Sequence, residues 1–297
     1  MAGENLNLPV RRYEKQYRGM LQTVFSATNA FQGAIAPIQI LDGVQNNASA
    51  FSVKTNNTPV VVGEYKTDKD VAFGTGTSNS SRFGQMTEVI YQDTDVPYDY
   101  TLAINEGIDR FTVNNDLNAA IADRLRLQSE AQTRKMNKRI GEYASKVAGK
   151  EETLASYEEK AIKDLFNKIN TYYVDLEVTA PATAYVKSDL YNAIVDMAQV
   201  SKGKGSSVNI DKNGLAYYKD IALQPVAAQY FEENTQAIVM PNGLIIPFVG
   251  INTARTITAV DFDGVILQAA AKGGQFILED NKKAVIKVTG TPTVPGP

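Results

Sequence analysis

The chain has 297 residues, with 30 basic and 33 acidic side chains, a net charge of −3 and no cysteine, histidine or tryptophan. This composition excludes disulfide bonds, thiolate metal sites, cysteine nucleophiles and every catalytic arrangement that needs an imidazole. No apolar run reaches the roughly eighteen residues that a membrane-spanning helix needs. The sequence therefore predicts a soluble intracellular protein with no membrane partner, in which any catalysis would depend on carboxylates, Lys, Tyr, Ser or Thr.

The first fifty residues are predicted to form an extended arm. Apolar residues recur at helical spacing between residues 9 and 25, with basic side chains between them, which indicates one short amphipathic helix with a basic polar face. A stretch rich in Gly, Asn and Gln follows and has little regular pattern.

Residues 51–104 are predicted to form a projecting hairpin. The segments FSVKT, PVVVGEY and MTEVIYQ have the composition of strands, and the tip at residues 66–84 is dense in Gly, Ser, Thr and Asn. A two-stranded projection is only marginally stable in water. We therefore expect this hairpin to lie on a neighbouring subunit.

A very long helix is predicted over residues 115–148. Residues 116–147 contain no proline and one glycine, and about thirty residues give a helix of about 45 to 50 Å. Gln128 and Gln132 interrupt its apolar stripe, so we expect the helix to lie across a sheet rather than in a coiled coil. A second helix, short strands and a Pro- and Gly-rich tail at residues 291–297, expected to be flexible, complete an α+β chain.

No catalytic, cofactor-binding or metal site is predicted. Asp93, Asp95 and Asp99 have the first spacings of a calcium-binding EF-hand loop, but Tyr98 and Ile104 occupy the positions that require Gly and Glu. The Gly- and Lys-rich segment at residues 201–207 lacks the residue order of a phosphate-binding loop. The sequence therefore favours a protein that is not an enzyme.

Charge is distributed unevenly along the chain. Residues 124–139 and 11–18 carry net charges of +5 and +3, which leaves −11 for the rest. Two interpretations remain open: a solvated helix face, which most charge runs are, or a surface that meets a polyanion. The basic residues concerned are Arg11, Arg12, Lys15, Arg18, Arg124, Arg126, Arg134, Lys135, Lys138 and Arg139.

The order of these parts resembles the major capsid proteins of tailed bacteriophages, which have the Hong Kong 97 fold. The most specific segments are EGIDRFTVNND, which opens the long helix, and the closing GGQFILEDNKKAVIKVTG. The resemblance implies an N-terminal arm (1–50), an extended loop (51–104), a peripheral domain (105–175 and 255–290) with its spine helix (115–148), and an axial domain (176–254).

The resemblance also implies a function. Pentamers and hexamers would close into an icosahedral shell around non-specifically bound double-stranded DNA, forming a virion capsid that assembles in the host bacterial cytoplasm with a separate scaffolding protein and a portal protein. The basic stretch of the spine helix would face the DNA.

Loop contacts with a neighbouring subunit are expected at Lys66, Lys69 and Arg82. Some capsid proteins cross-link such a lysine to an asparagine, but the asparagine and glutamate partners cannot be matched in this sequence. Two alternatives have other functions: the shell of a bacterial nanocompartment with the same fold, and, more distantly, a carboxylate-dependent enzyme.

Overall fold

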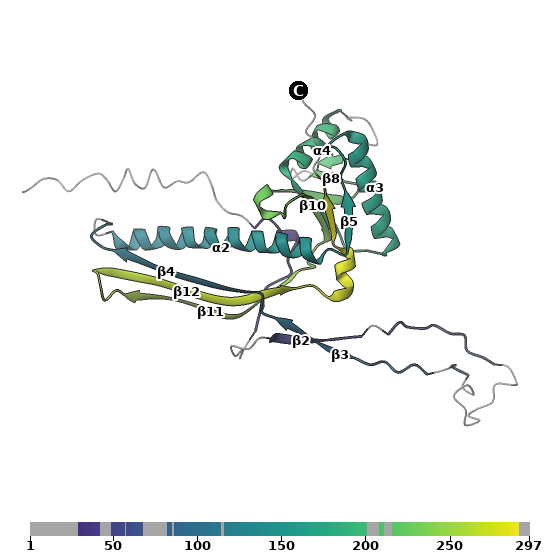
Figure 1. Ribbon diagram of the computed structural model, residues 1–297, viewed down its shortest axis with the longest axis horizontal. Coiled ribbons are helices and arrows are strands. Elements are labelled where there is room, and N and C mark those ends of the chain that lie inside the picture. Colours follow the sequence, from purple (N-terminus) through teal and green to yellow (C-terminus); the bar gives the residue numbers. More distant parts are fainter. Residues whose placement is uncertain are drawn as a thin grey trace, which may run out of the picture.

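A computed structural model describes residues 29–41, 49–56, 58–67, 82–84, 86–113, 116–200, 208–210 and 216–290. The structural statements below refer to these residues. Figure 1 shows three parts: a long helix lying over a flat sheet, a second sheet with helices packed against it, and a two-stranded projection. Among the described residues, no helix is long and apolar enough to cross a membrane.

The flat sheet has four strands in the order β1, β11, β12 and β4. The last three pair antiparallel, and β1 pairs parallel with β11 only at residues 248–249. Helix α2 (Leu117–Val147) packs against β4 and confirms the predicted spine helix. Its first turn is capped by Asp116, whose side chain accepts a hydrogen bond from the backbone N–H of Ala119. The strand bounds are β1 Gln39–Ile40, β4 Tyr100–Asp109, β11 Ile246–Thr258 and β12 Gly264–Phe276.

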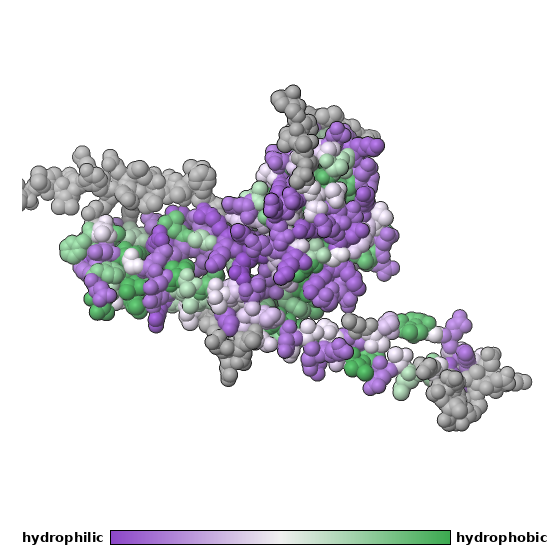
Figure 2. All heavy atoms as spheres, viewed as in Figure 1, coloured by the Kyte–Doolittle hydropathy of each residue, from purple (hydrophilic) through white to green (hydrophobic). Residues whose placement is uncertain are grey.

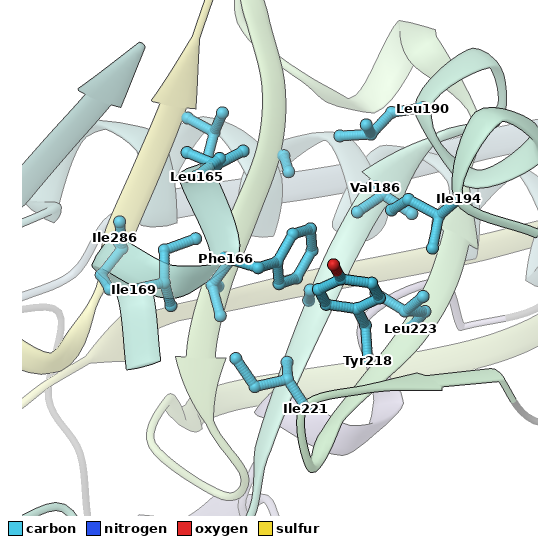
Figure 3. Close-up of a cluster of buried hydrophobic side chains, with 14 of the residues drawn as sticks. Leu165, Phe166, Ile169, Val186, Leu190, Ile194, Tyr218, Ile221, Leu223 and Ile286 are labelled. Atoms are coloured by element: carbon cyan, nitrogen blue, oxygen red, sulfur yellow. The ribbon is translucent and has the colours of Figure 1, made fainter. Parts of the chain in front are cut away.

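The second sheet has seven strands in the order β5, β13, β10, β6, β9, β8 and β7. Helices α3 (Glu159–Asp175) and α4 (Ser188–Val200) pack against it and enclose the larger apolar core (Figure 3). Phe166 of α3 meets Tyr218 of β8 there, with 4.8 Å between the ring centroids. The strand bounds are β5 Lys150–Thr153, β6 Ala182–Lys187, β7 Val208–Ile210, β8 Ala216–Tyr218, β9 Ile221–Val226, β10 Thr235–Pro241 and β13 Ile286–Thr289.

A short N-terminal segment joins the two sheets. It contains the 3-10 helix η1 (Gln32–Ala34). Two further 3-10 helices, η2 (Ala228–Tyr230) and η3 (Glu279–Ala284), lie in connections. Phe31 is fully buried in a second apolar core, 5.0 Å from the ring centroid of Tyr185. Because Phe31 packs with residues of both α2 and the seven-stranded sheet, it ties the two halves together.

Backbone contacts fix the same segment. The amide of Ala30 donates to Asn137 of α2 at 3.0 Å, and the carbonyl of Ala30 accepts from Gln224 of β9 at 2.9 Å. The helix α2 also lies close to η2, and Gly141 permits this approach. A Cβ atom at position 141 would lie 1.9 Å from the carbonyl oxygen of Tyr230. The spine helix therefore packs directly on the backbone of the second sheet's connection.

The projection differs from the predicted hairpin. Among its described residues, only β2 (Ser49–Thr55) and β3 (Gln92–Pro97) pair, at its base. Residues 59–65 and 86–91, expected as strands, lie outside any ladder. Pro59 has no N–H to donate, and neither the apolar run at residues 59–65 nor the alternating pattern at residues 86–92 specifies a partner within the same chain. The sequence was correct about a projection and wrong about strand pairing along its described arms.

Sheet membership divides the chain differently from the expected domain ranges. β5 and α3, expected with the spine helix, belong to the seven-stranded sheet and its core, as does β13. β11 runs across the expected boundary at residues 254 and 255, and β4 already begins at Tyr100. The reason is that strand partners come from distant segments, which the composition of a single strand does not identify.

Candidate assembly and nucleic-acid surfaces

The extended loop exposes an unusual amount of apolar surface. Val60, Val62 and Met86 are each about nine-tenths exposed, and Figure 2 shows apolar side chains along the projection. A ribbon without a ladder or a core cannot bury these groups itself, so they need another surface. The other large exposed apolar residues of the loop are Val61, Tyr65, Phe83, Val89, Ile90 and Tyr91.

Two contacts connect the arms of the loop near its tip. The backbone N–H of Lys66 donates to the carbonyl of Arg82 at 3.0 Å, and the rings of Tyr65 and Phe83 meet edge to face with centroids 5.0 Å apart. Lys66 and Arg82 of the predicted contact residues therefore lie together at one place on the loop. Lys69, the third, lies outside the described residues.

Two of the predicted DNA-facing residues instead hold the spine helix on its sheet. Arg124 makes two hydrogen bonds to Glu106 of β4, at 2.5 and 2.6 Å, and Gln128 donates to the same carboxylate at 2.6 Å. The hydrogen bond from Arg124 is the main reason why the pKa of Glu106 lies below its ordinary value.

Arg139 also holds the spine helix on the sheet, at the other end of β4. Its guanidinium donates to the carbonyl oxygen of Asp99 at 2.6 Å, lies 3.6 Å from the carboxylate of Asp99, and stacks over the ring of Tyr100. Burial raises the pKa of Tyr100. Arg124 and Arg139 thus hold the helix against β4 and the residue before it.

The other basic residues of α2 are differently placed. Arg126 and Arg134 share the carboxylate of Glu130, at 2.7 and 3.4 Å, and Lys138 lies 3.8 Å from Glu142. Lys135 is exposed, and no ion pair to it is found within the described part of the chain. Arg126, Arg134, Lys135 and Lys138 form the outward basic group of α2. The four predicted residues of the arm, Arg11, Arg12, Lys15 and Arg18, lie outside the described residues.

The aspartates considered for calcium do not converge. Asp93 faces Lys54 across the β2–β3 ribbon at 4.0 Å, whereas Asp99 faces Arg139. Within the described ranges, no group of three or more carboxylate, imidazole or thiol side chains is arranged to hold a metal ion.

One surface was not identified from the sequence. After residue 249, the outer edge of β11 has no paired strand among those described, and residues 253–258 are all exposed. The segment TARTIT has the composition of a strand, and its β-branched residues predicted this element correctly. Its position at an edge follows only from the sheet order.

The chain resembles known proteins in its three-dimensional structure. No family model matches the sequence, and no curated protein matches it significantly. The mature capsid of bacteriophage PhiM1 matches with a TM-score of 0.63 and 12% identity, over 98% of this chain and 96% of that one. The capsid of Ralstonia phage GP4 matches with a TM-score of 0.59 and 10% identity, over the full length of both chains.

A structure of Mycobacterium phage Che8 matches with a TM-score of 0.60 and 14% identity, over 97% of this chain and 98% of that one. The chain has the Hong Kong 97 capsid fold. The fold predicted from the order of segments is thereby confirmed. At these low identities the Hong Kong 97 fold is what the matches share with this chain, and no residue role is transferred from them.

Proposed function

We propose that this chain is the major capsid protein of a tailed bacteriophage, and that its copies form pentamers and hexamers that close into an icosahedral shell. The observation that carries the proposal is the match to phage capsid structures, which covers nearly all of this chain and of each matched chain. In this proposal the four-stranded sheet with α2 forms the peripheral domain, and the seven-stranded sheet forms the axial domain.

The extended loop supports assembly on physical grounds. A shell subunit is thin, and its projecting parts can bury apolar surface only against neighbouring copies. The nine large apolar residues that are exposed in the described part of the loop form the kind of surface that is rare on a monomer and common at an interface. We therefore assign the loop to contacts between subunits, with Lys66, Lys69 and Arg82 near its tip.

Double-stranded DNA is the proposed content of the shell. The outward basic group of α2, together with the arm residues at positions 11–18, would supply positive charge on the inner surface of the shell. Such contacts neutralise phosphates without reading bases, so binding would be non-specific and would weaken as salt increases. A scaffolding protein, a portal protein and assembly in the bacterial cytoplasm belong to the same proposal.

Electron microscopy and sedimentation of the purified chain test this function. We expect closed, shell-sized particles. A chain that stays a compact monomer at high protein concentration would contradict the proposal. Nuclease treatment of particles isolated from their host identifies the content: protected double-stranded DNA supports a phage capsid, whereas a protein cargo in its place would indicate the nanocompartment alternative.

A further inference from the structure

Beyond residue 249, no described residue pairs with the outer edge of β11. β1 covers it only at residues 248–249, and the stretch from residue 253 to 258 is exposed on both faces. Natural edges are commonly blocked by proline, by several charges or by a covering element. This stretch contains no proline and a single charge, Arg255. The opposite edge strand, β4, is different because α2 packs against it.

The extended loop carries a strand-like segment without a ladder. Residues 86–91, MTEVIY, form no strand and are all exposed, including Met86, Ile90 and Tyr91. The segment lacks glycine and proline, so each residue has a backbone donor and acceptor. The other arm of the loop is less suitable, because Pro59 cannot donate to a ladder and Gly63 weakens a strand.

The two segments are complementary in charge. Glu88 is the single charge of residues 86–91, and Arg255 is the single charge of residues 253–258. Arg255 donates to Gln268 at 2.9 Å, but no carboxylate pairs with it within the described ranges, and none of the described cations pairs with Glu88. Each segment therefore carries one unpaired charge near the middle of a β-prone stretch.

We propose that residues 86–91 of one copy add as a strand to the outer edge of β11 in a second copy, with Glu88 beside Arg255. Alternate residues of a strand share a face. With these two charges opposite, Met86 and Ile90 lie beside Thr253 and Ile257 in either strand direction. Main-chain hydrogen bonds then supply the contact, as in other cases of strand addition. This inference rests on the proposed shell and names the partner surface of its loop.

Engineered cysteines test the proposal directly, since the chain has no cysteine of its own. Two variants, Glu88→Cys and Arg255→Cys, are prepared separately, assembled together and oxidised with oxidised glutathione. A disulfide requires Cβ atoms within about 4.5 Å, and opposite residues on paired strands approach this distance. We expect a covalent dimer that contains one chain of each variant, and no dimer from either variant alone.

The matched control uses the other arm of the loop. Glu64→Cys is mixed with Arg255→Cys under the same conditions, and we expect at least about tenfold less covalent dimer. Normal particles without the Glu88→Cys cross-link would overturn the strand addition and leave the proposed shell intact. More cross-linking from Glu64→Cys would show that the wrong arm was chosen. Failure of the unsubstituted chain to form particles would contradict the shell itself.

Charge reversal provides a second measurement if the cysteine variants assemble poorly. Glu88→Arg and Arg255→Glu should each lower the yield of particles about three- to fivefold, because like charges directly opposite on paired strands repel. The double variant, which carries both reversals on one chain, should recover the original yield. Single reversals without effect, or a double reversal that adds the two losses, would overturn the proposal.

Discussion

Glu106 connects the spine helix to the strand beneath it, and its ionisation should be visible in the stability of the subunit. The hydrogen bond from Arg124 is the main cause of its lowered pKa. A carboxyl whose pKa is depressed by folding stabilises the protein above its ordinary pKa of 4.5, and this contribution disappears as the pH falls through the lower folded value. The link between helix and sheet is therefore expected to weaken in acid.

The test is the substitution Glu106→Gln, measured by urea unfolding of unassembled subunits. At pH 7 it should lower the free energy of unfolding by about 0.5 to 1 kcal/mol, because both partners of the ion pair reach solvent. The difference from the unsubstituted chain should shrink below pH 4.5. Glu142→Gln, at a looser and exposed pair, is the control. An equal difference at pH 3 and pH 7 would show that charge is not responsible.

Single residues also show what the sequence could not supply. The expected apolar stripe of α2 is only partly buried, since Leu125 is exposed. The interruption at Gln128 now has a cause, because its amide binds the carboxylate of Glu106. The partner lies on β4, the strand just before the helix, and the helical pattern does not show which side chain of that strand the helix meets. For the same reason, the basic residues of α2 were expected as one surface, although Arg124 and Arg139 are used within the subunit.

At the scale of elements, long local patterns were predictable and strand partners were not. The spine helix lies within two residues of its expected ends. Among the short strands expected after the second helix, two neighbouring segments, GLIIPFV and RTITAV, contribute to the single strand β11, with a register shift beside Gly250. β12 continues through Gly273 and Gly274, where a Cβ atom would collide with Phe248. These glycines reflect close packing and do not end the strand.

The outward basic group of α2 should contribute to DNA binding in a way that salt measures. We consider the triple variant Arg126→Gln, Lys135→Gln and Lys138→Gln, with binding of double-stranded DNA followed by fluorescence anisotropy at several salt concentrations. Each phosphate contact contributes about 0.9 to the slope of log affinity against log salt. If all three residues contact phosphates, the slope should decrease by about 2.7.

The control for this prediction removes the same charge elsewhere. Lys160, Lys163 and Lys168 are exposed on α3, and their replacement by glutamine changes the net charge equally. This triple variant should leave the slope nearly unchanged. Equal decreases for both variants would mean that net charge, rather than the side of α2, governs the affinity, and the DNA-facing assignment of the helix would fail.

At the scale of the whole molecule, the parts that fold the subunit are separate from the part assigned to joining subunits. The two apolar cores consist of residues from the sheets, their helices and the segment at Phe31. In the described part of the projection, Val96 at its base is the buried apolar residue. The loop therefore contributes little to the stability of an isolated subunit, although it exposes much apolar surface.

Excision of the loop separates these two roles. Thr55 and Gln92 are paired neighbours on β2 and β3, so an Asn-Gly turn can replace residues 56–91 and close the ribbon. We expect the thermal unfolding midpoint of the subunit to change by less than about 4 °C, which corresponds to about 1 kcal/mol or slightly more. Sedimentation should show that shells no longer form, because their principal apolar contact is missing. Normal shells from the excised chain would contradict the role assigned to the loop, and an unfolded subunit would show that the loop also supports the core.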